Sequence, residues 1–323
     1  MFRIVGTSLI ATLCILFAVP AAAADRYPER PIRLIVPFAP GGGTDITARI
    51  LGESMNEALD QTIVVDNRPG AGSIIGCNIV AKATPDGYTL LLASISLTVN
   101  AAVYKKIPYD VERDLTAITR VSDQPSVLVV QPSLPAKTFN DFVALARSQP
   151  GKFNFGTPGY GTASHLASEQ LWQKVGVDLV QVPFKGTGPA LTALLSNEIT
   201  IYMSTFASAL PFVKQGRLRA YAVTTQKRAG PLPDVPTLAE VGVPDYNYSA
   251  WYGLFAPAGT PQTIVAMIHK AAVDSLKSPK LLRTFENEGM NATPTTPKQF
   301  ASYIASERRK WSDVMRFAKI DQR

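Results

Sequence analysis

Short apolar segments alternate with helix-like segments along most of the chain, and this alternation constrains the fold more than any other feature. In the N-terminal part, strands are expected at 32–38, 62–65 and 88–93, and helices at 46–59 and 73–83. The last of these strands is almost entirely apolar, which is typical of burial on both faces. The β-α-β-α-β order predicts a parallel sheet with helices on both sides, and therefore an α/β fold.

A second series of the same kind follows. Strands separated by turns and helices are expected at 126–130, 152–155, 179–182, 199–203 and 218–224. A returning strand at 251–255 then leads to helices at 261–276 and 297–317. Two such units predict two lobes, with the chain crossing between them near Gln124 and again near Tyr252. We expect one lobe from 25–123 plus 253–323, and the other from 124–252.

The N-terminal residues 1–24 have the pattern of a secretory signal peptide. Arg3 supplies a positive start, an apolar stretch covers 9–19, and three alanines at 22–24 resemble a cleavage site before Asp25. The apolar stretch is too short to span a membrane comfortably. We therefore expect export to the periplasm and a mature chain that begins near Asp25.

Charge and cysteine content narrow the possible partners. The formal net charge is +7, but the basic residues are spread along the chain and form only one short run, at 308–310. Because no basic stripe is interleaved with aromatic residues, no nucleic-acid partner is expected, whereas a mildly positive field favours small anions. The mature chain keeps a single cysteine, Cys77, so it cannot form an internal disulfide. No histidine or cysteine cluster has the spacing of a metal site, and neither a metal nor a cofactor is expected.

Three glycine-containing turns, at 41–45, 156–162 and 186–189, each follow an expected strand and precede an expected helix. Glycine lets a ligand approach the backbone, and a helix start presents unpaired N–H groups and the positive end of its dipole. Ligands in open α/β sheets bind at the carboxyl ends of strands, so two facing lobes would bring these turns to one cleft. Alternatively, the glycines only make tight connections. The spacing matches neither the G-x-G-x-x-G pattern nor a P-loop.

Combinations of residues suited to catalysis are sparse. Ser164 and His165 are neighbours on an expected helix and do not face each other. His269 lies in the middle of a helix and is interpreted as structural. Asp45 could serve as a general base, but a capping carboxylate at a helix start is the simpler interpretation, and Cys77 is interpreted as a buried small hydrophobe. We therefore expect no enzymatic activity.

Small hydroxyl and amide groups surround the glycine turns instead. They are Thr44, Ser94, Ser96, Asn100, Thr157, Thr162, Thr187, Ser204 and Thr205. Each charge-assisted hydrogen bond contributes about 1.5–3 kcal/mol, and a helix terminus adds about 0.3–2 kcal/mol. Several of these suffice for micromolar binding of a carboxylate, about −8 kcal/mol. No buried arginine is required, and the candidate loops contain only one cation, Lys185.

Motifs in order along the chain resemble those of the Bug family, the periplasmic solute-binding proteins of tripartite tricarboxylate transporters. They include YPERPIRLIVPFAPGGGTDITARIL, VVDNRPGAGSIIG, AKATPDGYTLLLAS, GTPGYGTASHLASE and VPFKGTGPAL. The resemblance covers essentially the whole mature chain. It implies a two-lobed type II periplasmic-binding-protein fold in which each lobe is a mixed, mostly parallel sheet flanked by helices. Two crossover strands would act as the hinge, and the lobes would close on a small carboxylate.

The resemblance also implies the partners and the site residues. We expect a monomer that passes its ligand to membrane transporter subunits; a ligand-sensing module that signals to a two-component sensor stays open as an alternative. The first glycine loop would hold one carboxylate, partly through ordered waters, with Phe38, Ala39, Gly41, Gly42, Gly43 and Asp45. Ser94 matches a family hydroxyl at the end of the third strand. From the second lobe, Gly159, Gly161 and Thr162 match the site for the other end of the ligand, and the loop of Lys185, Gly186, Thr187 and Gly188 lies beside it. The other candidates in this lobe, which the resemblance does not assign, are Thr157, His165, Ser204 and Thr205.

One departure from the family pattern bears on the ligand. After the strand that ends near Met203, the family often carries a short stretch with Asp or Asn, whereas this chain has Ser204, Thr205 and Phe206. Loss of a carboxylate there would remove an acceptor for a ligand amino group. We therefore expect a mono- or dicarboxylate without an amino group, rather than an amino acid.

Overall fold

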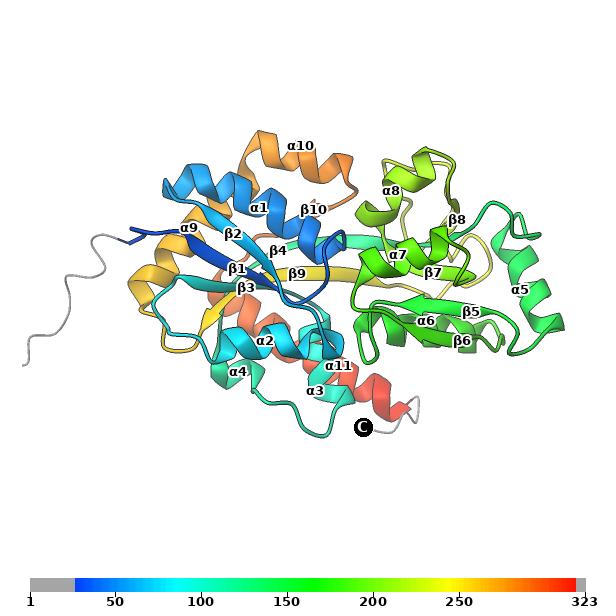
Figure 1. The fold of residues 1–323 in the computed structure, drawn as a ribbon, viewed down its shortest axis with the longest axis horizontal. Helices are drawn as coiled ribbons and strands as arrows, with labels where there is room; N and C mark the ends of the chain where they lie inside the picture. Colours follow the sequence, from blue (N-terminus) through cyan, green and yellow to red (C-terminus); the bar gives the residue numbers. More distant parts are fainter. Residues whose placement is uncertain (1–26, 318–323) are drawn as a thin grey trace, which may run out of the picture.

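The computed structural model describes residues 27–317, and the expected signal peptide lies outside this range. The described chain forms two lobes that lie side by side along the long axis of the molecule (Figure 1). Each lobe is built on a mixed sheet flanked by helices. Within residues 27–317, no helix has the length and apolar character needed to cross a membrane.

The first lobe is built on strands in the order β2-β1-β3-β9-β4. Their bounds are β1 Ile32–Val36, β2 Ile63–Asn67, β3 Thr89–Ser94, β4 Leu115–Val130 and β9 Ser249–Pro257, with a short β10 at Asn291–Ala292 beside β4. The helices are α1 Gly43–Leu59, α2 Ile74–Ala81, α3 Ser96–Val103, α4 Val111–Asp114, α9 Gln262–Lys277, α10 Pro279–Asn287 and α11 Pro297–Phe317, and a 3-10 turn covers Ala71–Ser73. Parallel pairing is confined here to β1 with its neighbours β2 and β3.

The second lobe continues from the C-terminal half of β4. Its strands are β5 Asn154–Thr157, β6 Val180–Pro183, β7 Ile201–Thr205 and β8 Arg219–Val223. Its helices are α5 Phe139–Ser148, α6 Ala163–Lys174, α7 Thr187–Leu195 and α8 Phe206–Lys214. β5 pairs in parallel with β6 and β7, and β4 pairs antiparallel with β7 and β8.

Strands β4 and β9 connect the lobes. They pair antiparallel, with Gln124 opposite Ala250 and Ser122 opposite Tyr252, and β4 then enters the second sheet from Ser126 onward. The predicted two-lobed α/β fold with two crossover strands is therefore confirmed. The lobe boundaries at 123/124 and 252/253 stay a prediction.

Alternating side chains of β1 pack into two different hydrophobic core layers, one on each face of the sheet. Ile35 packs with Leu91 and Cys77 on the face covered by α2, α3 and α11. Leu34 packs with Leu51 of α1 on the face covered by α1 and α9. This period of two places helices on both sides of the sheet. Cys77 is fully buried, which raises the pKa of its thiol to about 12, as suits a packing residue rather than a nucleophile.

Helix α1 begins three residues earlier than the apolar stripe predicted, at Gly43 instead of Ile46. Gly42 is its N-cap and has no side chain to cap the helix. The glycine loop is therefore continuous with the first turn of the helix, and the loop backbone carries the unpaired N–H groups of the helix start.

Candidate ligand-binding site

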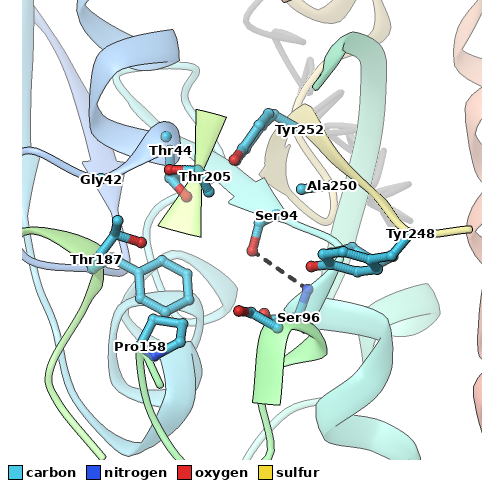
Figure 2. Close-up of a pocket in the computed structure, with 14 residues that line it drawn as sticks. Gly42, Thr44, Ser94, Ser96, Pro158, Thr187, Thr205, Tyr248, Ala250 and Tyr252 are labelled. Atoms are coloured by element: carbon cyan, nitrogen blue, oxygen red, sulfur yellow. Dashed lines mark hydrogen bonds between the residues drawn. The ribbon is translucent and has the colours of Figure 1, made fainter. Parts of the chain in front are cut away.

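A cavity between the lobes, which we call the central cavity, lies beside the hinge strands (Figure 2). Its empty volume is about 400 Å³, part of it open to solvent. From the first lobe it is lined by Phe38, Gly42, Gly43, Thr44, Ser94, Ile95 and Ser96. The second lobe contributes Pro158, Ser164, Thr187 and Thr205, and the segment entering β9 contributes Tyr248, Ala250 and Tyr252.

Five helices begin at this cavity. Its lining includes the first turns of α1, α3, α6 and α7 and the N-cap of α8. Each helix start leaves N–H groups without intrahelical partners and carries the positive end of the helix dipole. Among the fourteen lining residues that the structure describes, none has a charged side chain. These helix starts, rather than charged side chains of the described lining, are what favour an anion with several acceptor oxygens here.

Asp45 holds the glycine loop in shape from behind the cavity. Its carboxylate accepts a hydrogen bond from the Gly41 N–H at 3.0 Å and another from the Asn67 side chain at 3.0 Å, and Arg49 pairs with it. Burial opposes ionisation of this carboxyl, but hydrogen bonds from Arg49, Gly41 and Asn67 outweigh it and hold its pKa below the ordinary value. Asp45 therefore stabilises the turn and does not itself line the cavity.

Tyr252 reaches the cavity from the hinge. Its hydroxyl accepts a hydrogen bond from the Gln124 side-chain amide at 2.9 Å, and the Gln124 carbonyl oxygen accepts from the Ala207 N–H at 3.2 Å. Burial raises the pKa of Tyr252 far above its ordinary value, so the phenol keeps its proton. Because the hydroxyl already accepts from Gln124, its proton is available for a ligand in the cavity.

The lobes touch each other around the cavity. The Ala39 N–H donates to the Lys185 carbonyl at 3.1 Å, and the Ala163 N–H donates to the Ser96 hydroxyl at 3.3 Å. Thr187, whose hydroxyl accepts from Tyr202 at 3.1 Å, lies opposite Gly42. These contacts join loops of the two lobes, so the structure is in a closed arrangement.

The structure brings some of the predicted site residues together and leaves others outside. The predicted residues that line the cavity are Phe38, Gly42, Gly43, Ser94, Thr187 and Thr205. Those that do not line it are Ala39, Gly41, Asp45, Thr157, Gly159, Gly161, Thr162, His165, Lys185, Gly186, Gly188 and Ser204. A direct ligand contact by any predicted residue stays a prediction.

Several predicted site residues that do not line the cavity make hydrogen bonds to neighbouring groups of the protein. Thr162 caps α6, because its hydroxyl accepts from the His165 N–H and donates to the Gly159 carbonyl. The His165 ring nitrogen Nδ1 accepts from the Gly161 N–H at 3.2 Å, and the Ser204 hydroxyl donates to a backbone carbonyl. These groups shape the turns at the edge of the cavity.

The lining residues at the hinge were not among the site residues predicted from the sequence. Ala250 and Tyr252 alternate along the returning strand and therefore share one of its faces, and Tyr248 comes just before the strand begins. That alternation was visible in the sequence, but nothing indicated that this face meets the glycine loops.

Within the described range, no group of three or more His, Cys, Asp or Glu residues could hold a metal ion.

Comparisons with known proteins agree with this architecture. The profile of the family described as "Tripartite tricarboxylate transporter family receptor" matches residues 47–319. Protein BugT of Bordetella pertussis is 36% identical over 316 residues, which cover 96% of this chain and 97% of BugT.

Solved structures are similar over most of the chain. The periplasmic binding protein BugD is 32% identical, with a TM-score of 0.89 over 92% of this chain and 100% of BugD. The R. palustris protein Rpa4515 with adipate is 32% identical, with a TM-score of 0.88 over 91% of this chain and 99% of Rpa4515. MatC from Rhodopseudomonas palustris with bound malate is 32% identical, with a TM-score of 0.84 over 89% of this chain and 99% of MatC.

Proposed function

Because the chain belongs to the tripartite tricarboxylate transporter receptor family, whose members are periplasmic solute-binding proteins and not enzymes, we propose that it captures a small organic carboxylate between its lobes. We further propose that it delivers this ligand to a membrane transporter of the same type. Export by the N-terminal signal peptide belongs to the same proposal.

The convergence of five helix starts on a cavity whose described lining residues carry no charged side chain supports the proposal. A carboxylate accepts hydrogen bonds, and the lining offers hydroxyl and backbone N–H donors. Each charge-assisted hydrogen bond contributes about 1.5–3 kcal/mol. Several of them, less the cost of ordering and closure, reach the roughly −8 kcal/mol of micromolar binding.

The hydroxyl groups are spread along the cavity, which suits a ligand with a carboxylate at each end. Figure 2 shows Thr44 and Thr205 on one side, Ser96 and Tyr248 on the other, and Ser94 between them. Ala250 and other apolar residues lie among these lining groups and suit the carbon chain of a ligand. Relatives with about one third of their residues identical hold adipate and malate, both dicarboxylates.

An amino acid is a poorer fit than a simple organic acid. A ligand ammonium needs a carboxylate or another strong acceptor, and the fourteen described lining residues include no Asp, Glu or Asn. The Ser204 hydroxyl, in the stretch where the family often has Asp or Asn, donates to the Thr205 carbonyl. An ammonium buried without a partner is costly.

Calorimetry on the mature protein tests the ligand class. We expect micromolar binding of at least one of succinate, malate and adipate, and much weaker binding of aspartate and glutamate. Tight binding of either amino acid together with no binding of the simple acids would contradict the proposal. For the partner, chemical crosslinking in the native membrane should capture transporter subunits; capture of a histidine-kinase ectodomain instead would favour the sensing alternative.

A further inference from the structure

A second cavity, which we call the side cavity, adjoins the central cavity at the lobe boundary. Its empty volume is about 430 Å³, and its lining includes Tyr104 from the first lobe and Tyr160, Phe184 and Lys185 from the second. Two residues, Phe38 and Pro158, line both cavities. These two residues therefore lie between the cavities, and we call them the wall.

The peptide group between Phe38 and Ala39 is held in place at both its carbonyl and its N–H. The Phe38 carbonyl accepts a hydrogen bond from the Asn67 side chain at 3.0 Å, and the next N–H, of Ala39, donates to the Lys185 carbonyl at 3.1 Å. Only 7% of Phe38 is exposed. Pro158, the other residue of the wall, lies at the edge of the central cavity in Figure 2, and its ring restricts the local backbone. The wall is therefore a built feature of the closed arrangement.

The two cavities differ in charge. Among the described residues, none with a charged side chain lines the central cavity, whereas Lys185 lines the side cavity. Among the ion pairs of the described residues, none includes the Lys185 ammonium. A carboxylate that reached the side cavity would therefore meet a cation that no other described residue neutralises. Tyr104 and Tyr160 offer apolar ring surface for the carbon chain on the way to it.

We propose that Phe38 sets the upper length of the ligand. It ends the central cavity, so that a dicarboxylate must place both carboxylates among the helix starts. Without the Phe38 ring the two cavities would join, and a longer dicarboxylate would extend into the side cavity and pair with Lys185. This inference rests on the proposed function, because it assigns one dimension of the same site.

A series of linear dicarboxylates tests the inference by calorimetry on the mature protein. We use succinate, adipate, suberate and sebacate, which differ only in chain length. The wild type should bind the longest members at least about tenfold more weakly than its best ligand, a difference of about 1.4 kcal/mol. Phe38→Ala should remove most of that loss for suberate and sebacate. Adding Lys185→Gln to Phe38→Ala should weaken sebacate by about two- to fivefold, because Lys185 is exposed and solvent partly screens the contact that is lost.

Phe212→Ala is the matched control. Phe212 lines a groove on the outer side of the two glycine loops that shares no residue with the central cavity. The Phe212→Ala variant also loses a phenyl ring at the lobe boundary, but its preference for ligand length should stay that of the wild type. If Phe38→Ala proves unstable in a thermal melt, Phe38→Leu opens the wall partly and should shift the preference in the same direction.

The outcomes separate the two proposals. Equal length profiles in the wild type and in both Phe38 variants would overturn the length inference and leave the carboxylate function intact. A gain for long ligands that Lys185→Gln does not reduce would overturn the role of Lys185. No binding of any dicarboxylate by any of the proteins would overturn the proposed function and the inference together.

Discussion

The hydroxyl of Tyr252 occupies the space where any residue other than glycine would carry its Cβ at position 43. A Cβ on Gly43 would overlap that hydroxyl and would lie 2.5 Å from the side-chain nitrogen of Gln124. A loop of the first lobe and the hinge strands are therefore in contact at the centre of the cavity. The bare backbone at Gly43 allows the tyrosine to present its proton to a ligand beside the start of α1.

Gly43→Ala should weaken ligand binding by at least about tenfold, because the added methyl displaces Tyr252 and Gln124. Overpacking of this kind also costs about 1–3 kcal/mol of stability. Gly42→Ala is the matched control: its Cβ would lie 3.3 Å from the Thr187 side chain, a contact that a small shift relieves. Calorimetry on both variants checks this, and an equal loss of affinity in the two would contradict the role given to Gly43.

Gly42→Val should prevent closure of the lobes while leaving the fold intact. The branched side chain would fill the space between Gly42 and Thr187, where the lobes meet across the cavity. Small-angle scattering on the wild type should show contraction at saturating succinate, malate or adipate, whichever binds, since only the closed state lets both lobes donate to it. The variant should show no contraction, together with an unchanged circular dichroism spectrum. Contraction of the variant to the wild-type dimension would refute this prediction.

Tyr252→Phe should weaken binding by about ten- to a hundredfold, because it removes one donor to a charged ligand. Tyr246→Phe serves as the control. The Tyr246 hydroxyl is buried and donates to the Ala167 carbonyl at 2.7 Å, and Tyr246 does not line the cavity. Both variants should lose about 0.5–1.5 kcal/mol of stability from a missing hydrogen bond, but only the first should lose affinity. Calorimetry and urea unfolding together separate the two effects.

Asp45→Asn should remove a pH-dependent part of the stability. Because the pKa of the folded carboxyl lies below its ordinary value near 3.8, its ionised form stabilises the fold at neutral pH. This contribution is fully present above the unfolded pKa and is lost as the pH falls through the folded pKa. Urea unfolding at pH 7, 5 and 3 should therefore show a gap between wild type and variant that narrows only at the lowest pH. A gap that stays constant over this range would argue against the prediction.

Most of the larger helices and strands could be predicted from patterns among neighbouring residues in the sequence. The apolar stripes predicted α1 and α9, a further helix was expected at the position of α11, and the run at 88–93 predicted β3. Helix α3 left no such signal, because nearly all of its residues are buried and it has no polar face. Helix α8 was also missed: it is short and contains Pro211, which argues against a helix when it is read locally.

The glycine loop was predictable as an anion site because turn chemistry and helix starts are properties of contiguous residues. The composition of the cavity was not. Gln124 and Tyr252 are 128 residues apart, and their hydrogen bond exists only because β4 and β9 pair in one register. Lys185 and His165 stand beside glycine turns in the chain, yet a wall and a capping turn keep them out of the central cavity. Local periodicity therefore specifies the elements, whereas packing between distant segments selects which side chains meet the ligand.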